Sequence, residues 1–221
     1  MFDSSQVFQY LINFLYILPV ILISLTVHEY AHALAASRLG DPTPRDTGRL
    51  TLNPLHHIDP LGFIVMLLVH FGWAKPVQVN PLFFKNPRKG MMLTAIAGPI
   101  SNLILCFISS IPYYFSIRYR WPVYFIIFFA YMVMLNIGLA VFNLIPIHPL
   151  DGSRVLSYFI PSYASFMAKY GGYIQIGFIV LLILPDFFGF PDVLGSVILF
   201  VQSKTSSILF SLWSVLFSII P

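Results

Sequence analysis

The sequence predicts an all-α polytopic membrane protein, a bundle of about five to six transmembrane helices with a small β-strand element at the inner membrane face. Three observations predict this fold class. Of the 221 residues, 58% are hydrophobic and only 9% are charged, whereas a soluble domain carries about 25% charged residues. Several uncharged runs reach the roughly 20 residues that a helix needs to cross a bilayer. A region with proline, glycine and asparagine turn residues, 38–89, separates the first two of these runs.

The same composition excludes several other classes of protein. So few charged residues exclude a soluble enzyme and a disordered chain. The net charge of +4 is small and scattered, so we expect no nucleic-acid partner. The single cysteine, Cys106, lies in an apolar run, which excludes a disulfide framework and a thiolate metal cluster. No linker or repeat divides the chain, so we expect one domain over residues 1–221.

Four segments are candidates for membrane spans, and they cover residues 4–37, 90–117, 121–147 and 170–185. The first is uncharged over residues 4–27 and continues through a histidine motif to about residue 37, and the other three are uncharged throughout. The first run lacks the basic start and the cleavage site of a signal peptide. The tail, residues 193–221, is apolar but interrupted at 203–205, which predicts either one kinked span or a surface helix followed by a short span.

The region between the first two spans, residues 38–89, contains turn residues and seven of the 12 Lys and Arg residues. Within it, the apolar stretch 58–73 is short for a span and contains Asp59, so we expect it to be re-entrant or packed against the bundle. Alternating residues at 48–53 and 75–80 predict two short strands. These strands would form the small sheet at the inner membrane face.

The distribution of basic residues predicts the orientation in the membrane, because Lys and Arg gather on the cytoplasmic side. Residues 1–37 contain neither, so we expect the N-terminus outside. If the stretch 58–73 does not cross, the basic residues of 38–89 all lie inside; if it crosses, the asymmetry largely disappears. We therefore expect a multi-pass protein of a bacterial cell membrane in which this stretch does not cross.

The single glutamate of the chain, Glu29, lies in the motif HEYAH at residues 28–32 of the first span. His28 and His32 are four residues apart on a helix, so their imidazoles share one face and can ligate one zinc ion. Glu29 would then take a proton from water that the zinc has acidified. The alternative is a polar cluster that only hydrogen-bonds neighbouring helices, but ionisable groups within a span are costly and usually functional.

A catalytic zinc needs three protein ligands and an open position, so another segment must supply the third ligand. Asp151 is the favoured carboxylate because it follows the third span, at about the depth of the inner end of the first. It lies in the sequence NLIPIHPLDG, residues 143–152, where two prolines break the helix. Backbone groups freed at membrane depth are tolerated mainly where they line a cavity. In the second span, Asn102 could hydrogen-bond a neighbouring helix.

Together, HEYAH and NLIPIHPLDG resemble the motifs HExxH and NxxPxxxLDG of the site-2 protease family of intramembrane zinc metalloproteases. The similarity extends through residues 40–62 and through AGPISN at 97–102. It therefore covers a core of about residues 15–160, and the spans at about 170–221 would be accessory.

This resemblance implies roles for individual residues. The zinc ligands would be His28, His32 and Asp151, the general base Glu29 and a residue near the substrate Asn143. Family members often have proline where this chain has His148. That departure leaves His148 as a second possible ligand, three residues before the aspartate, or as a residue that supports or gates the site.

We therefore expect an intramembrane metalloprotease with one catalytic Zn2+, whose partners are the lipid bilayer and membrane-protein substrates. It would hydrolyse peptide bonds in or next to transmembrane segments, in regulated intramembrane proteolysis. A membrane metal transporter is one alternative, but it does not need the glutamate and often shows internal repeats, which are not evident here. An inactive scaffold homologue is the other, and the presence of the candidate base and all three candidate ligands disfavours it.

Overall fold

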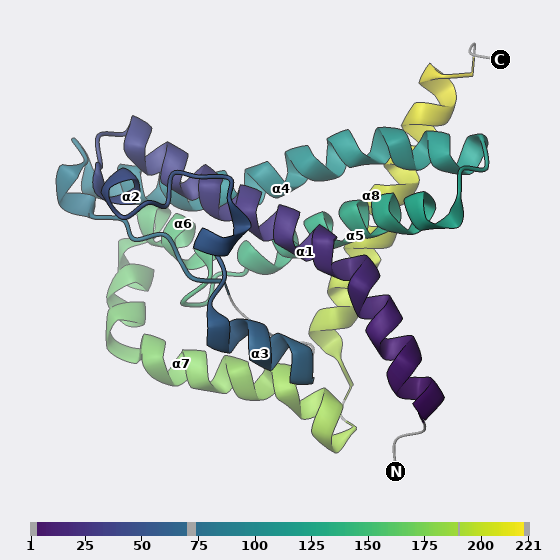
Figure 1. The fold of residues 1–221 in the computed structure, drawn as a ribbon. Helices are drawn as coiled ribbons and strands as arrows, with labels where there is room; N and C mark the ends of the chain where they lie inside the picture. The colour runs from purple at the N-terminus through teal and green to yellow at the C-terminus, as the bar shows by residue number, and fades with distance from the viewer. Residues whose placement is uncertain (1–3, 70–73, 190, 219–221) are drawn as a thin grey trace.

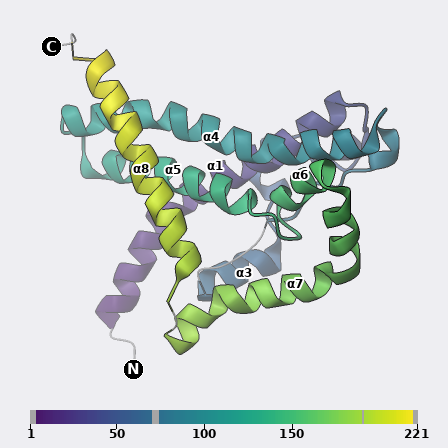
Figure 2. The same cartoon turned by 180° about the vertical axis from the view of Figure 1, so that it is seen from behind.

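Three long helices form the centre of the computed structural model, which describes residues 4–69, 74–189 and 191–218 (Figure 1). These helices are α1 (Ser4–Arg38), α4 (Pro87–Arg118) and α5 (Val123–Asn143). α4 and α5 are joined by a short turn and lie side by side, and α1 packs across both (Figures 1 and 2). Within the described residues, five helices are long and apolar enough to cross a membrane: these three, α7 (Pro161–Phe188) and α8 (Val193–Leu216).

The five helices confirm the predicted polytopic membrane fold and change some of its boundaries. α5 ends at Asn143, before the predicted residue 147, because Pro146 has no N–H and disfavours helical backbone in the residue that precedes it. α7 begins at Pro161 rather than at residue 170, since proline is well suited to the first turn of a helix. α8 continues through residues 203–205 as one helix, which decides between the two predictions for the tail.

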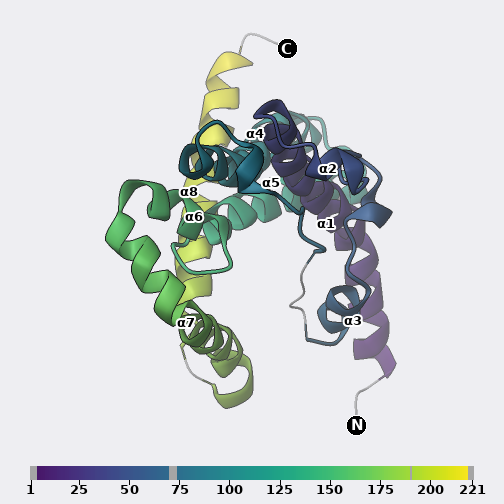
Figure 3. The ribbon, with the colours of Figure 1, turned by 90° about the vertical axis from the view of Figure 1, so that its left-hand side faces the viewer.

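Four shorter elements connect α1 to α4. They are α2 (Thr43–Asp46), η1 (Pro54–His56), α3 (Pro60–Val69) and η2 (Pro81–Phe83). The ten residues of α3 span about 15 Å, half of the hydrocarbon thickness. Gly62 and Phe63 of α3 line a pocket together with Leu22 and Leu25 of α1, and Figure 3 shows the two helices on the same side of the molecule. As far as the structure describes it, α3 is too short to cross, in agreement with the prediction for the stretch 58–73. Residues 70–73 of that stretch lie outside the described residues.

The predicted β-strand element is wrong for the part of the chain that the structure describes. There, neither 48–53 nor 75–80 forms a strand, and the single β-bridge joins Ile58 to Ala74. Gly48 has a φ of +68°, a left-handed conformation that turns the chain where the alternating pattern required an extended one. The alternating apolar residues therefore lie in irregular segments and not in the strands of a sheet.

Two of the backbone donors of residues 75–80 bind side chains instead of a partner strand, while the N–H of Lys75 donates to the carbonyl oxygen of His57 at 2.8 Å. The N–H of Val77 donates to Oε2 of Glu29 at 3.0 Å, and the N–H of Asn80 donates to Oδ2 of Asp41 at 2.7 Å. These two bonds hold the extended segment along α1. They leave no ladder of donors for a sheet.

The break after α5 returns the chain to the centre of the bundle. α6 (Asp151–Phe159) follows the break and packs against α4. Gly152 permits this return, because a Cβ at that position would collide with the carbonyl group of Leu144. Asp151, the first residue of α6, is thereby buried within the bundle.

The last helix, α8, packs across α4 and α5 (Figure 2). Side-chain hydrogen bonds to both helices hold it in place. Nε1 of Trp213 donates to Oγ of Ser110 at 2.8 Å, and Nε2 of Gln202 donates to the carbonyl oxygen of Met134 at 2.8 Å. α8 therefore supports the central helices from outside.

Candidate metal centre

Three buried side chains from two helices meet at one point of the bundle. They are His28 and His32 on α1 and Asp151 at the start of α6. The Nε2 atoms of the two imidazoles are 3.0 Å apart. Oδ2 of Asp151 lies 3.3 Å from Nε2 of His28 and 3.2 Å from Nε2 of His32. The structure thus brings together the three residues that the sequence predicted as ligands.

Each imidazole uses its other ring nitrogen to bind α4. Nδ1 of His28 donates to Oδ1 of Asn102 at 2.6 Å, and Nδ1 of His32 donates to the carbonyl oxygen of Thr94 at 2.7 Å. A neutral imidazole carries one proton, so both Nε2 atoms present lone pairs to the shared point. Two lone pairs and a carboxylate oxygen at this separation repel each other unless a cation lies between them.

The donor atoms fit a zinc ion. Ligands at about 2.0–2.1 Å from a tetrahedral zinc lie roughly 3.3–3.4 Å apart, and the observed separations of 3.0, 3.2 and 3.3 Å approach that value. Oδ2 of Asp151 is buried and has no hydrogen-bond donor among the described residues, so it is an acceptor that lacks a positive partner. Two imidazoles and one carboxylate also leave the fourth position that a catalytic zinc keeps open.

A glycine lets α4 approach both imidazoles. A Cβ on Gly98 would lie 2.5 Å from Cε1 of His28 and 2.5 Å from Cε1 and Nε2 of His32. Ordinary contacts of a Cβ begin at 3.4 Å. Glycine is therefore the residue that allows the α4 backbone to support the two rings. In the sequence, Gly98 stands out only as part of AGPISN, and no sequence pattern reveals its steric role.

Glu29 lies half-buried on α1, next to His28 in the chain. Its Oε2 accepts the N–H of Val77, as described above, so the extended segment orients the carboxylate. The second oxygen of the carboxylate remains available for proton transfer.

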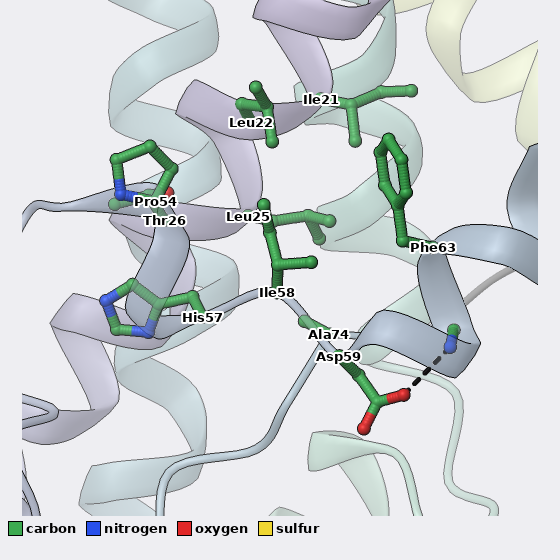
Figure 4. Close-up of a pocket in the computed structure, with 11 residues that line it drawn as sticks. Ile21, Leu22, Leu25, Thr26, Pro54, His57, Ile58, Asp59, Phe63 and Ala74 are labelled. Carbon is green, nitrogen blue, oxygen red and sulfur yellow. Dashed lines mark hydrogen bonds between the residues drawn. The ribbon is translucent and has the colours of Figure 1, made fainter.

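The other residues named from the sequence lie outside the cluster. Asn143 is the last residue of α5, and its amide donates to the carbonyl oxygen of Leu139 at 3.0 Å. His148 is exposed and is not part of the group of potential metal ligands found among the described residues. Asp59 directly precedes α3, and its Oδ1 accepts the N–H of Gly62 in the first turn of that helix at 2.8 Å (Figure 4).

A predominantly apolar pocket lies beside α1, on the N-terminal side of the histidine motif (Figure 4). Its walls include Leu22 and Leu25 of α1, with Ile58 and Phe63 facing them from the connecting region. Leu25 precedes Glu29 by four residues, which is about 6 Å along the helix axis. The pocket therefore lies about one helical turn from the candidate base.

Comparison with known proteins identifies the family. The sequence model of Peptidase family M50 matches residues 118–184. Over 190 residues the chain is 41% identical to "Putative zinc metalloprotease YwhC" of Bacillus subtilis, covering 83% of this chain and 84% of the relative. The chain belongs to peptidase family M50. The resemblance to site-2 proteases is therefore confirmed, and this M50 protein is a membrane zinc metalloprotease with Zn2+ as its cofactor.

Mycobacterial relatives of this M50 protein carry a similar name. "Putative zinc metalloprotease Rip2" of Mycolicibacterium smegmatis is 30% identical over 195 residues, covering 83% of this chain and 72% of the relative. The protein of the same name from Mycobacterium tuberculosis is 29% identical over 164 residues, covering 70% of this chain and 61% of the relative. No solved structure matches the chain significantly.

Proposed function

We propose that this M50 protein hydrolyses peptide bonds in or next to transmembrane segments of membrane-protein substrates, in regulated intramembrane proteolysis. His28, His32 and Asp151 would hold the zinc ion, and Glu29 would be the general base. The observation that carries the proposal is the convergence of three buried donor atoms, 3.0–3.3 Å apart, among helices long enough to span a membrane.

Glu29 carries the proton in this mechanism. When bound, zinc supplies Lewis-acid polarisation of the scissile carbonyl and lowers the pKa of the attacking water. Glu29 accepts the proton of that water through the oxygen that Val77 does not bind, and then gives it to the leaving amine. The bond from Val77 keeps the carboxylate from rotating away between the two transfers.

The residues near Glu29 favour a substrate with apolar side chains around the scissile bond. The pocket formed by Leu22, Leu25, Ile58 and Phe63 would accept an apolar side chain close to the scissile bond. A helical substrate must unwind locally, because its carbonyl groups are otherwise hydrogen-bonded within the helix. Asn143 is proposed to hold the unwound segment, and to do so its amide must exchange the bond to Leu139 for one to the substrate.

The proposal is tested with the purified full chain, loaded with zinc, and a tagged peptide that contains a transmembrane segment. Glu29→Gln keeps the size and polarity of the side chain but cannot accept a proton, so cleavage should fall by about 10²–10⁴-fold with zinc still bound. Asp46→Asn, in an exposed connection, is the matched control and should cleave at the parental rate.

Two results would contradict the proposal in different ways. Cleavage by Glu29→Gln at the parental rate would exclude this residue as the base. Cleavage of soluble peptides, with transmembrane peptides left intact, would leave the chemistry standing and refute the proposed class of substrate.

A further inference from the structure

We propose that Asn136 on α5 is a positioning residue for the zinc site, although it does not touch the three candidate ligands. Through Asn102 it would fix the tautomer of His28, so that the Nε2 lone pair faces the metal. The inference rests on the proposed metal site, and the experiment below distinguishes the failure of one from the failure of the other.

The orientation of Asn136 is determined by the backbone of its own helix. Asn102 and Asn136 are both 0% exposed, at the point where α1, α4 and α5 meet. Nδ2 of Asn136 donates to the carbonyl oxygen of Met132 at 2.8 Å and to Oγ of Ser24 at 2.8 Å. A backbone carbonyl can only accept, so the nitrogen of this amide, and not its oxygen, must face Met132.

This orientation favours one orientation of Asn102. Nδ2 of Asn102 donates to Oδ1 of Asn136 at 2.7 Å and, over a longer distance of 3.4 Å, to the carbonyl oxygen of Ser24. The bond to Asn136 is the shorter of the two. The oxygen of the Asn102 amide therefore faces Nδ1 of His28, at 2.6 Å. Because an amide oxygen can only accept, the proton of the His28 imidazole lies on Nδ1, and Nε2 is left as a metal-binding lone pair. The carbonyl oxygen of Met132 on α5 thus acts on the tautomer of His28 across three hydrogen bonds, in the same sense as the longer bond from Asn102 to Ser24.

His32 has no such dependence on side chains. Its Nδ1 donates directly to the carbonyl oxygen of Thr94. A side-chain substitution does not remove a backbone acceptor, so the tautomer of His32 should survive changes that alter His28. This asymmetry separates the proposal from a purely structural role, in which buried amides only join helices.

The test uses the full chain in lipid nanodiscs and two measurements. Asn136→Leu lets the Asn102 amide rotate and turn its NH2 group toward His28, which favours the wrong tautomer. We expect 15N spectra of the zinc-free, histidine-labelled protein to show His28 moving toward the Nε2–H form while His32 is unchanged. The dissociation constant for zinc, measured by competition with a chelator, should rise by about 10- to 100-fold.

Two variants serve as controls. Gln202→Leu removes a hydrogen bond of the same kind, from a side-chain amide to a carbonyl of α5, and should leave the zinc affinity and the His28 signal unchanged. Asn136→Asp keeps an oxygen facing Asn102 and should retain the wild-type tautomer even if the protein is less stable. Both roles predict the wild-type tautomer in Asn136→Asp, whereas a purely structural role predicts it in Asn136→Leu as well.

A double variant tests whether the two amides act in series. Asn102→Leu should weaken zinc binding, and adding Asn136→Leu should weaken it no further. If the losses of zinc affinity in the two single variants add in the double variant, the two amides do not act in series and the proposal is overturned. It is also overturned if Asn136→Leu keeps the wild-type tautomer and zinc affinity while His28→Ala loses zinc. Zinc retained by His28→Ala would instead refute the proposed metal site itself.

Discussion

Replacing Gly98 by alanine adds one methyl group at the tightest contact between α4 and the imidazoles. The new Cβ would lie 2.5 Å from Cε1 of His28 and from two ring atoms of His32, where ordinary contacts begin at 3.4 Å. The rings or the helix must therefore separate by about 0.9 Å. Neither ring can turn aside freely, because Asn102 and Thr94 hold the two Nδ1 atoms.

We expect Gly98→Ala to slow the reaction, although alanine by itself stabilises a helix relative to glycine. A misplacement of about 1 Å at a catalytic site can cost roughly 100-fold in rate. Alanine in the interior of a helix is otherwise more favourable than glycine by about 1 kcal/mol. Gly98→Ala should therefore cleave a transmembrane peptide about 100-fold more slowly and bind zinc more weakly, without a loss of helix content.

The assay compares kcat/KM, zinc affinity and helix content of the variant and the parent in the same detergent. Gly177→Ala on α7 is the control, because nothing lies within 4 Å of the Cβ that it adds, and it should behave as the parent. Parental zinc affinity and turnover in Gly98→Ala would show that the imidazoles do not lie against this helix as described. The reasoning about the metal centre would then be refuted.

Two further predictions concern the connecting region. Val77→Pro removes the N–H that orients Glu29, so turnover should fall by roughly tenfold with zinc retained. The control Gln78→Pro should have little effect on turnover. Equal rates in the two variants would contradict the role given to the N–H of Val77. Cysteines placed at Asp46 and Asn86, with the native cysteine replaced by serine, should react with a membrane-impermeant reagent only after the membrane is opened. Labelling in intact cells would overturn the inside location proposed for this region.

The spanning helices were predictable because crossing a bilayer requires long apolar segments, which composition reveals directly. The start of α7 was not, since Lys169 ends the apolar run while the helix begins earlier, at Pro161. A helix continues as long as its backbone bonds are satisfied, whatever the polarity of its side chains. Apolar runs thus identify a helix better than they place its ends.

The strands failed for a related reason. Alternating residues at 75–80 suggest which side chains share a face, but not where the backbone N–H groups bind. Here Glu29 and Asp41 accept the N–H groups of Val77 and Asn80, and both acceptors are distant in sequence. Local pattern carries no information on such contacts.

The candidate site was predictable as far as local spacing extends. The i, i+4 spacing places His28 and His32 on one face of any helix, whereas Asp151 required an argument from depth and the resemblance to a family. The contributions of Gly98 and Asn136 depend on how three helices cross. No feature of the sequence alone reveals that crossing.

The most direct test of the metal centre is the zinc content of Asp151→Ala and His148→Ala, purified side by side with the parent. We expect about one zinc per chain in the parent and in His148→Ala, and loss of zinc in Asp151→Ala, because three ligands hold a catalytic zinc and one would be missing. Zinc retained by Asp151→Ala and lost by His148→Ala would contradict the metal centre assigned to these helices.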